Sequence, residues 1–208
     1  MGMTRREFLK NAAMAVAAGA MMQPDKLLAP KKAEANEPGS PKNILNYNPN
    51  MQYRPMGRTG VDVSALGFGC MGMNYNRSVS PSRKECIKVI REAVERGVTL
   101  FDTAIIYGPL INEELVGEAL APYKGQVAVT TKFGHEVING KATGRQNSRP
   151  EIIRRYCEES LRRLRVDCLE MFYQHRLDRN VPIEEVAGTI GDLIKEGKVK
   201  RWGVCEVS

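Results

Sequence analysis

The sequence predicts an α/β protein built on a parallel β-sheet. Two observations support this fold class: five short apolar runs have the character of strands, and amphipathic helical segments lie between them. Strands that alternate with helices over short links are typical of parallel sheets with crossover helices. The predicted strands span residues 65–69, 99–103, 127–132, 168–174 and 199–204.

A β-hairpin is predicted ahead of the first of these strands. Residues 53–54 and 61–62 flank the segment 57–60, which reads Gly-Arg-Thr-Gly. Glycines favour tight turns because they adopt positive φ angles without steric cost. The alternation of strands and helices therefore begins after an opening hairpin.

The predicted helices have recognisable ends. The first begins near residue 81, where Ser82 and Glu85 have the spacing of a capping box, and it ends before Gly97. The last spans residues 182–196 and ends before Gly197. These start and stop signals fix the helices between the predicted strands.

The first 35 residues have the features of an export signal. Arg5 and Arg6 stand in a twin-arginine pattern, a weakly apolar run covers residues 11–22, and residues 33–35 (Ala-Glu-Ala) offer a cleavage site. The alternatives are an amphipathic N-terminal helix or a membrane anchor, but a bilayer span needs ~20 apolar residues. We therefore expect transient use of the twin-arginine export machinery, no stable membrane anchor, and a periplasmic or other extracytoplasmic location.

The predicted organisation has three parts. Residues 1–35 are the signal peptide, and residues 36–52 are a linker, because they are rich in Asn, Pro, Gly and Ser and lack apolar periodicity. Residues 53–208 form one α/β domain.

The charge distribution argues against a nucleic-acid partner. The chain carries +7, of which the signal segment holds +3, since it contains six basic and three acidic residues, and the remainder holds +4. A basic cluster over residues 149–165 resembles a nucleic-acid stripe. Apolar residues at helical spacing in the same segment indicate instead an outer helix with its charges in solvent. The cluster comprises Arg149, Arg154, Arg155, Arg162, Arg163 and Arg165.

The cysteines predict neither a metal site nor a disulfide framework. Their number is odd, they form no C-x-x-C pair, and neither His135 nor His175 lies at zinc-finger spacing from them. A protein that folds before export would also not need disulfides. The five are Cys70, Cys86, Cys157, Cys168 and Cys205.

Four polar side chains stand at or just after the ends of three predicted strands. They are Asp102, Tyr107, Lys132 and His175: an acid, a phenol, an amine and an imidazole. In a barrel of parallel strands the C-terminal ends open on one face, so residues far apart in sequence can converge there. Singly, each has a structural alternative: a helix cap, a packing residue, a solvated strand end and a core imidazole, respectively. Together they form a set able to transfer protons.

The sequence around these four residues resembles the aldo-keto reductase family. Residues 102–117 contain Asp-Thr-Ala-Ile-Ile-Tyr-Gly and then Asn-Glu-Glu-Leu-Val-Gly, which is similar to the family's signature after its second strand. Residues 66–73, 147–150 and 181–185 resemble its first strand and the starts of its third and fourth helices. The resemblance covers roughly residues 53–208. It implies a (β/α)8 TIM barrel with the four side chains as its catalytic tetrad.

The length of the chain limits that expectation. A barrel of this kind needs eight strand–helix units and typically ~250 residues. Subtracting the 35-residue signal from 208 residues leaves 173. We therefore predict a TIM barrel of aldo-keto reductase type that is truncated after about the fifth strand, with two strand edges left unpaired.

The resemblance also implies a chemistry for the tetrad. A small aldehyde or ketone would be reduced with NADPH, NADH being the alternative, and the cofactor would supply the hydride. Tyr107 would donate the proton, although a phenol with a pKa near ~10 is a weak acid at neutral pH. Lys132 would stabilise the phenolate, Asp102 would keep Lys132 charged and aimed, and His175 would orient the substrate oxygen.

Cofactor contacts are expected at two places. The turn after the first strand resembles the family's backbone contact to the nicotinamide. After the fifth strand the family presents a serine and then Asn or Glu to the carboxamide, whereas this chain has a cysteine, which is a weak donor, and a glutamate. No glycine-rich phosphate loop of either common type occurs in the sequence. The predicted cofactor-binding residues are Gly69, Cys70, Met71, Asp102, Cys205 and Glu206.

Two functions therefore remain open. The first is an NADP-dependent reductase of small carbonyl compounds. The second is a truncated, non-catalytic remnant that persists as a scaffold or interaction module, because the family's adenosine-phosphate site belongs to its last three units. Coding sequence that continues past Ser208 would favour the first.

Overall fold

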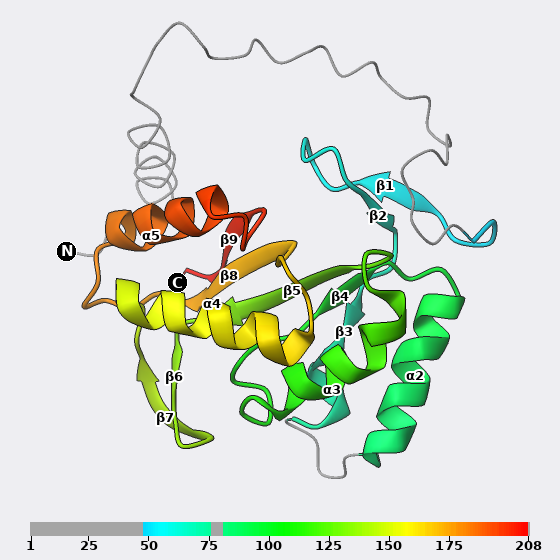
Figure 1. Ribbon diagram of the computed structural model, residues 1–208, viewed down its shortest axis with the longest axis horizontal. Helices are drawn as coiled ribbons and strands as arrows, with labels where there is room; N and C mark the ends of the chain where they lie inside the picture. Colours follow the sequence, from blue (N-terminus) through cyan, green and yellow to red (C-terminus); the bar gives the residue numbers. More distant parts are fainter. Residues whose placement is uncertain (1–47, 76–80, 208) are drawn as a thin grey trace, which may run out of the picture.

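The computed structural model describes residues 48–75 and 81–207. A parallel sheet with the strand order β3-β4-β5-β8-β9 lies at its centre (Figure 1). All neighbouring strands in it run parallel, so the predicted α/β class and its five parallel strands are confirmed. The predicted signal peptide and residues 36–47 of the linker lie outside the described residues. The strands are β3 (Phe68–Gly69), β4 (Leu100–Asp102), β5 (Ala128–Phe133), β8 (Met171–Arg176) and β9 (Trp202–Glu206).

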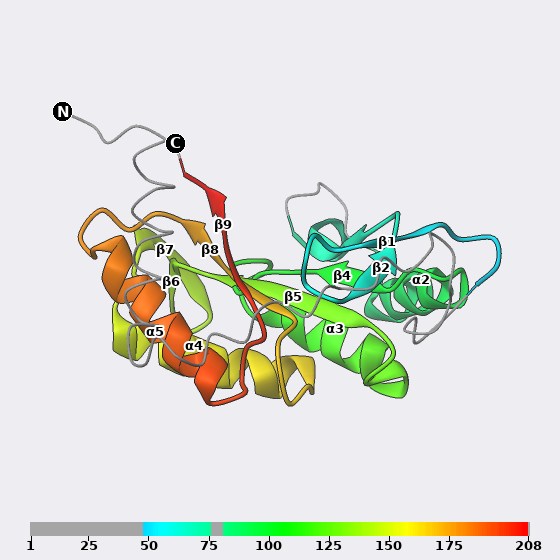
Figure 2. The same ribbon diagram turned by 90° about the horizontal axis from the view of Figure 1, so that it is seen from above.

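Four helices follow the strands and cover one face of the sheet (Figures 1 and 2). The main core lies between this face and the helices, with side chains such as Ile90, Leu115, Ile153 and Ile190 fully buried. No helix among the described residues is long and apolar enough to span a membrane. The helices are α2 (Arg83–Glu95), α3 (Ile111–Leu120), α4 (Pro150–Leu164) and α5 (Ile183–Lys195).

The predicted helix ends agree with the structure. Ser82 caps α2, its side chain accepting from the backbone N–H of Glu85 while the Glu85 carboxylate accepts from the N–H of Ser82. Gly97 and Gly197 follow α2 and α5 at positive φ angles of 92° and 75°. Glycine tolerates this conformation at a helix end without steric cost.

Three predicted strands begin too early. The segments 65–69, 168–174 and 199–204 become strands only at Phe68, Met171 and Trp202. Leu169 and Val199 instead form a single isolated bridge and are buried in the core. These two residues are in the core, whereas Leu66 in the first segment is 66% exposed. Hydrophobicity alone marks the links as strand although no continuous ladder forms.

Two hairpins flank the sheet. The predicted one consists of β1 (Tyr53–Pro55) and β2 (Asp62–Ser64), which pair antiparallel. The second, β6 (His135–Ile138) and β7 (Lys141–Gln146), directly follows β5 and was not predicted. Its second strand is exposed almost throughout and has no apolar alternation. The pair Asn139-Gly140, with φ angles of 50° and 71°, was the one local signal for its turn.

Helices α3 and α4 approach unusually closely. A Cβ atom on Gly117 would lie 2.1 Å from the carbonyl oxygen of Arg163, so glycine is required at the contact. The approach brings the Arg163 side chain to Glu113, and their ion pair measures 2.7 Å.

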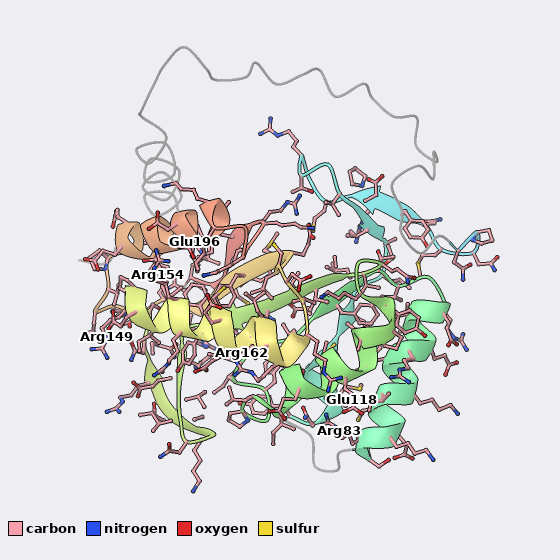
Figure 3. The ribbon with its side chains drawn as sticks, viewed as in Figure 1. Arg83, Glu118, Arg149, Arg154, Arg162 and Glu196 are labelled. Carbon is pink, nitrogen blue, oxygen red and sulfur yellow. The ribbon has the colours of Figure 1, made fainter. Side chains whose placement is uncertain are left out.

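The basic cluster on α4 is only partly solvated. Arg154 lies on the outer surface and pairs with Asp192 of α5 and with Glu196, the residue that follows α5, as expected for an outer helix (Figure 3). Arg163 differs, because its side chain is only 12% exposed and its partner Glu113 is fully buried. The prediction of solvated charge was wrong for this residue, since helical spacing does not show that α3 lies against it.

Candidate active site

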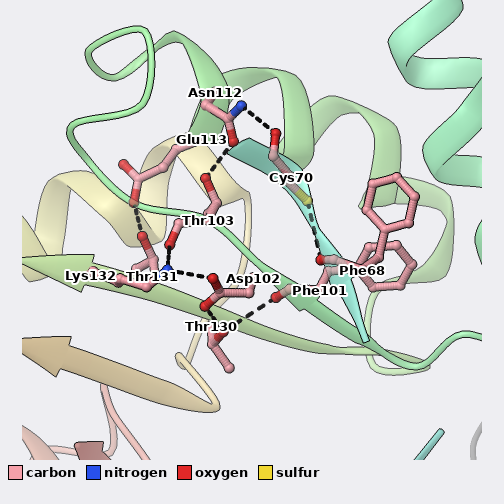
Figure 4. A network of polar contacts seen from close by, with 10 residues as sticks. All are labelled: Phe68, Cys70, Phe101, Asp102, Thr103, Asn112, Glu113, Thr130, Thr131 and Lys132. Carbon is pink, nitrogen blue, oxygen red and sulfur yellow. Dashed lines mark hydrogen bonds and ion pairs between the residues drawn. The ribbon is translucent and has the colours of Figure 1, made fainter. Parts of the chain in front are cut away.

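The C-terminal ends of β4 and β5 bring an acid and an amine together. Asp102 closes β4, and its register partner on β5 is Thr130, two residues before Lys132. The Lys132 ammonium forms an ion pair with the Asp102 carboxylate and donates to the carbonyl oxygen of Thr103 at 2.8 Å (Figure 4). Thr130 Oγ1 donates to Asp102 Oδ1 at 2.7 Å. Because the Lys132 side chain is 7% exposed, these contacts fix its cation in place.

Tyr107 lies in the loop after β4, beside this ion pair. Its ring is buried and stacks on Tyr75, with the ring centroids 5.4 Å apart. Lys132 Nζ lies 5.3 Å from the centroid of the Tyr107 ring. Burial raises the pKa of Tyr107, and this effect outweighs the lowering by Lys132. The phenol is therefore protonated at neutral pH and has a proton to donate.

His175 completes the group from β8. Its ring meets the Tyr107 ring edge to face at a centroid distance of 5.9 Å. Burial, followed by the charge of Lys132, lowers the pKa of His175 to about 3, so the imidazole is neutral at physiological pH. Its Nδ1 atom is buried and has no hydrogen-bond partner among the residues that the structure describes. A neutral imidazole can still donate one hydrogen bond from its protonated nitrogen.

The predicted cofactor turn after β3 is held by the helix that follows β4. Asn112 is buried at the start of α3, and its Nδ2 donates to the carbonyl oxygen of Cys70 at 2.9 Å (Figure 4). Cys70 begins a short 3-10 helix, η2 (Cys70–Met73), and burial raises the pKa of its thiol. A Cβ on Gly69 would meet no atom within 4 Å. The turn therefore offers open backbone rather than a reactive thiol.

The second predicted cofactor contact lies at the end of β9. Cys205 and Glu206 are both exposed there. The Glu206 carboxylate pairs with Arg176 of β8 at 2.6 Å. The two residues therefore lie at the same end of the sheet as the tetrad, on the strand next to the one that carries His175.

The structure brings all four predicted tetrad side chains together; their catalytic roles remain a prediction. It adds supporting contacts that sequence reasoning missed, because they depend on register and on loop packing. The Thr130 contact could have been found from the pairing of β4 with β5, whereas the stacking of Tyr75 has no local signal. Within the part of the chain that the structure describes, no group of three or more His, Cys, Asp or Glu side chains could hold a metal ion.

Comparisons with known proteins agree with this arrangement. The family described as "Aldo/keto reductase family" matches residues 65–208. Over 154 residues the chain is 42% identical to the Glycine max protein named "Probable aldo-keto reductase 1". The matched region covers 74% of this chain and 44% of that protein. The chain therefore spans less than half the length of this relative.

Solved structures show the same likeness. An aldo-keto reductase from Bacillus halodurans in its holo form has a TM-score of 0.67 at 28% identity, over 74% of this chain and 50% of that one. The glycerol dehydrogenase of Gluconobacter oxydans has a TM-score of 0.62 at 30% identity, over 74% and 48% of the two chains.

Proposed function

This chain belongs to the aldo/keto reductase family, and we propose that it forms the carbonyl-reducing site of an NAD(P)H-dependent oxidoreductase acting on small aldehydes or ketones. The observation that carries this proposal is the fixed cation of Lys132, which is paired with Asp102 and lies beside the protonated phenol of Tyr107. The family membership supports the same reaction.

The proposed reaction adds a hydride to the carbonyl carbon and a proton to the carbonyl oxygen. Tyr107 donates the proton, and the phenolate that forms is stabilised by the ammonium of Lys132. Asp102 pairs with that ammonium and aims it, and the Thr103 carbonyl accepts a second of its hydrogen bonds. The neutral ring of His175 donates to the substrate oxygen and orients it.

The residues present fit the nicotinamide end of the cofactor. NADPH, which we propose over NADH, supplies the hydride when it is bound. Gly69 pairs in register with Asp102 and leaves open space where a side chain would stand, so a flat ring has room beside the ion pair. The exposed Glu206 carboxylate can accept from a carboxamide N–H group, and Cys205 offers a weak S–H donor.

Isotope transfer tests the proposal directly. The purified chain is incubated with 4-nitrobenzaldehyde and saturating NADPH that carries deuterium at both positions of the reactive carbon of the nicotinamide. We expect 4-nitrobenzyl alcohol with one deuterium on the carbinol carbon. Alcohol formation without deuterium would contradict a direct hydride transfer, and a lack of any alcohol would favour the scaffold function.

We also propose twin-arginine export, with residues 1–35 as the cleaved signal, residues 36–52 as the linker and residues 53–208 as the exported domain. Replacing Arg5 and Arg6 together by lysine should retain the chain in the cytoplasm. The matched control replaces Lys31 and Lys32 by arginine and should still be exported. Cell fractionation with N-terminal sequencing gives the result; exported material that begins at Met1 would contradict cleavage.

A further inference from the structure

A cavity lies between the unpredicted β6–β7 hairpin and α4, and none of the four tetrad residues lines it. Its volume is about 340 Å³. Sites for small molecules typically measure ~300–1,000 Å³, so the cavity is large enough for a small organic ligand. Its walls include Leu110, Val137, Ile138, Arg155, Tyr156 and Glu159.

Hydrogen bonds hold two walls of this cavity in place. The backbone N–H of Val137 on β6 donates to the hydroxyl of Tyr156 on α4 at 3.0 Å, which joins the hairpin to the helix. Leu110 has a φ angle of 71°, which a leucine rarely adopts. Its N–H donates to the carbonyl oxygen of Ile105 at 2.8 Å. The cavity is therefore built into the fold, as sites for small molecules usually are.

One side of the cavity is apolar and adjoins the tetrad. Leu110 and Val137 also pack in the small apolar cluster that contains Tyr107. Ile138 follows on β6 and is 49% exposed, although it is a large apolar residue. A ligand that covered Ile138 would remove apolar surface from water, which is favourable. This side of the cavity therefore suits a hydrocarbon group.

The opposite side carries an arginine whose hydrogen-bond donors are unused. The Arg155 guanidinium lies over the Tyr156 ring at 5.2 Å, a contact that orients its plane. Its Nε atom is 3.9 Å from Glu159, which is beyond hydrogen-bond distance. Glu159 also faces Arg163 at 3.5 Å. Within the described part of the chain the Arg155 guanidinium donates no hydrogen bond, and its planar fork matches an anionic oxygen pair.

We propose that this cavity binds the anion of a small carboxylic acid with an apolar body. The carboxylate binds Arg155, and the apolar body lies against Leu110 and Ile138. Glu159, at the same side, disfavours ligands with a second negative charge, such as phosphate monoesters, because like charges repel. The inference goes beyond the proposed carbonyl reduction and does not depend on it.

The test compares an acid with its neutral analogue. Dissociation constants of 3-phenylpropanoate and of 3-phenylpropan-1-ol are measured by calorimetry on the full chain. We expect the acid to bind about tenfold more tightly than the alcohol, and Arg155→Gln to remove this difference. Arg162→Gln is the control, since Arg162 is exposed on the same helix but does not line the cavity (Figure 3). Equal affinity for the acid in the parent chain and in Arg155→Gln overturns the proposal.

Backbone amide NMR shows where the acid binds, whether or not the chain reduces aldehydes. The amide signals of Leu110, Val137 and Ile138 should shift with 3-phenylpropanoate. Shifts at Arg176 and Glu206 without a shift at Ile138 would place the acid at the exposed ion pair near the tetrad and overturn the site. No shift at millimolar acid would also overturn it.

A third ligand tests the choice of a carboxylate over a phosphate. We expect 2-phenylethyl phosphate to bind more weakly than 3-phenylpropanoate, because Glu159 repels its second charge. Tighter binding of the phosphate would overturn the assignment of this ligand class to the cavity.

Discussion

Adjacent residues of β5 enter two buried ionic networks on opposite faces of the sheet. Lys132 points to the face of the tetrad and pairs with Asp102. Thr131 points to the helices, where its hydroxyl donates to Glu113 at 2.6 Å (Figure 4). Glu113 also accepts from Arg163 at 2.7 Å. Both networks follow from the alternation of side chains along a strand.

The network on the helix face (the outer network) and the network on the tetrad face (the inner network) differ in how deeply their carboxylates are buried. Each oxygen of the Glu113 carboxylate has a partner, and so has each oxygen of the Asp102 carboxylate. The Glu113 side chain is fully buried, whereas the Asp102 side chain is 38% exposed. Next to Asp102, the buried Nδ1 atom of His175 has no hydrogen-bond partner among the described residues. The outer network joins helices to the sheet, and the catalytic role of the inner network stays a prediction.

The largest expected effect is a loss of activity when Tyr107, on the tetrad face of the sheet, loses its hydroxyl. In a chain extended to the full family barrel, Tyr107→Phe removes the proton donor and one hydroxyl, and should lower kcat/KM for 4-nitrobenzaldehyde by ~10² to 10⁴-fold, the usual contribution of general-acid catalysis. The thermal unfolding midpoint should change little, because the ring stays. Tyr123→Phe, the same change far from the site, is the control. If Tyr107→Phe kept more than about a tenth of the parent rate, a different residue would be the acid.

The next largest expected effect is a loss of stability when the buried Glu113–Arg163 pair on the helix face of the sheet is broken. Glu113→Ala leaves Arg163 buried without its main partner, which typically costs about 3–5 kcal/mol of unfolding free energy. Glu118→Ala on the same helix breaks the exposed pair with Arg83 and should cost far less, because solvent screens a surface ion pair (Figure 3). Urea unfolding of both variants gives the comparison. Equal losses would mean that burial does not distinguish the two pairs.

A third prediction concerns coupling within the inner network. Asp102→Asn should act through Lys132, so its effect on kcat/KM should be much smaller once Lys132 is already methionine. The interaction free energy expected for residues in one network is about 0.5–3 kcal/mol. A double-mutant cycle with Lys132→Met measures it, and the cycle of Asp102→Asn with Glu118→Ala is the control. Additive effects in the first cycle would mean that Asp102 acts independently of the ammonium.

The inner network was largely predictable, and the outer one was not. Asp102, Lys132 and His175 lie at the ends of strands, and the rule that parallel strands end on one face is enough to bring them together. Tyr107 lies five residues after the end of β4, so its position relative to the strand did not indicate that it belongs to the site. Only the sequence motif around it did. The cap at Ser82 was equally visible, because a capping box is local in sequence.

Long-range packing explains what the sequence did not reveal. Arg163 looked like one more solvated arginine, since its burial depends on the close approach that Gly117 permits between α3 and α4. The β6–β7 hairpin lacks apolar alternation, so no periodicity marked it and His135 was considered only as a zinc ligand. Arg163 and His135 owe their surroundings to contacts between elements, and neither carries a signal for those contacts in its own segment.

The smallest expected effect is the pH dependence that His175 gives to stability. Its pKa is about 3 in the folded protein, against about 6.5 for an unfolded chain. Below pH 6.5 the unfolded state therefore binds a proton that the folded state does not, so stability is lost as the pH falls from about 6.5 toward 3. Between pH 7 and 5.5 the loss should be about 1 kcal/mol. His175→Phe should remove this component from urea unfolding curves recorded at the two pH values, while the matched exposed change Lys141→Ala should keep it. The pKa of His135 is also lowered, so His135 adds a loss of stability of the same sign. The quantity to compare is therefore the loss of unfolding free energy between the two pH values, in the parent chain and in His175→Phe. An equal loss in both would show that His175 protonates as readily in the folded protein as in the unfolded chain, and the inner face would then carry a charged imidazole.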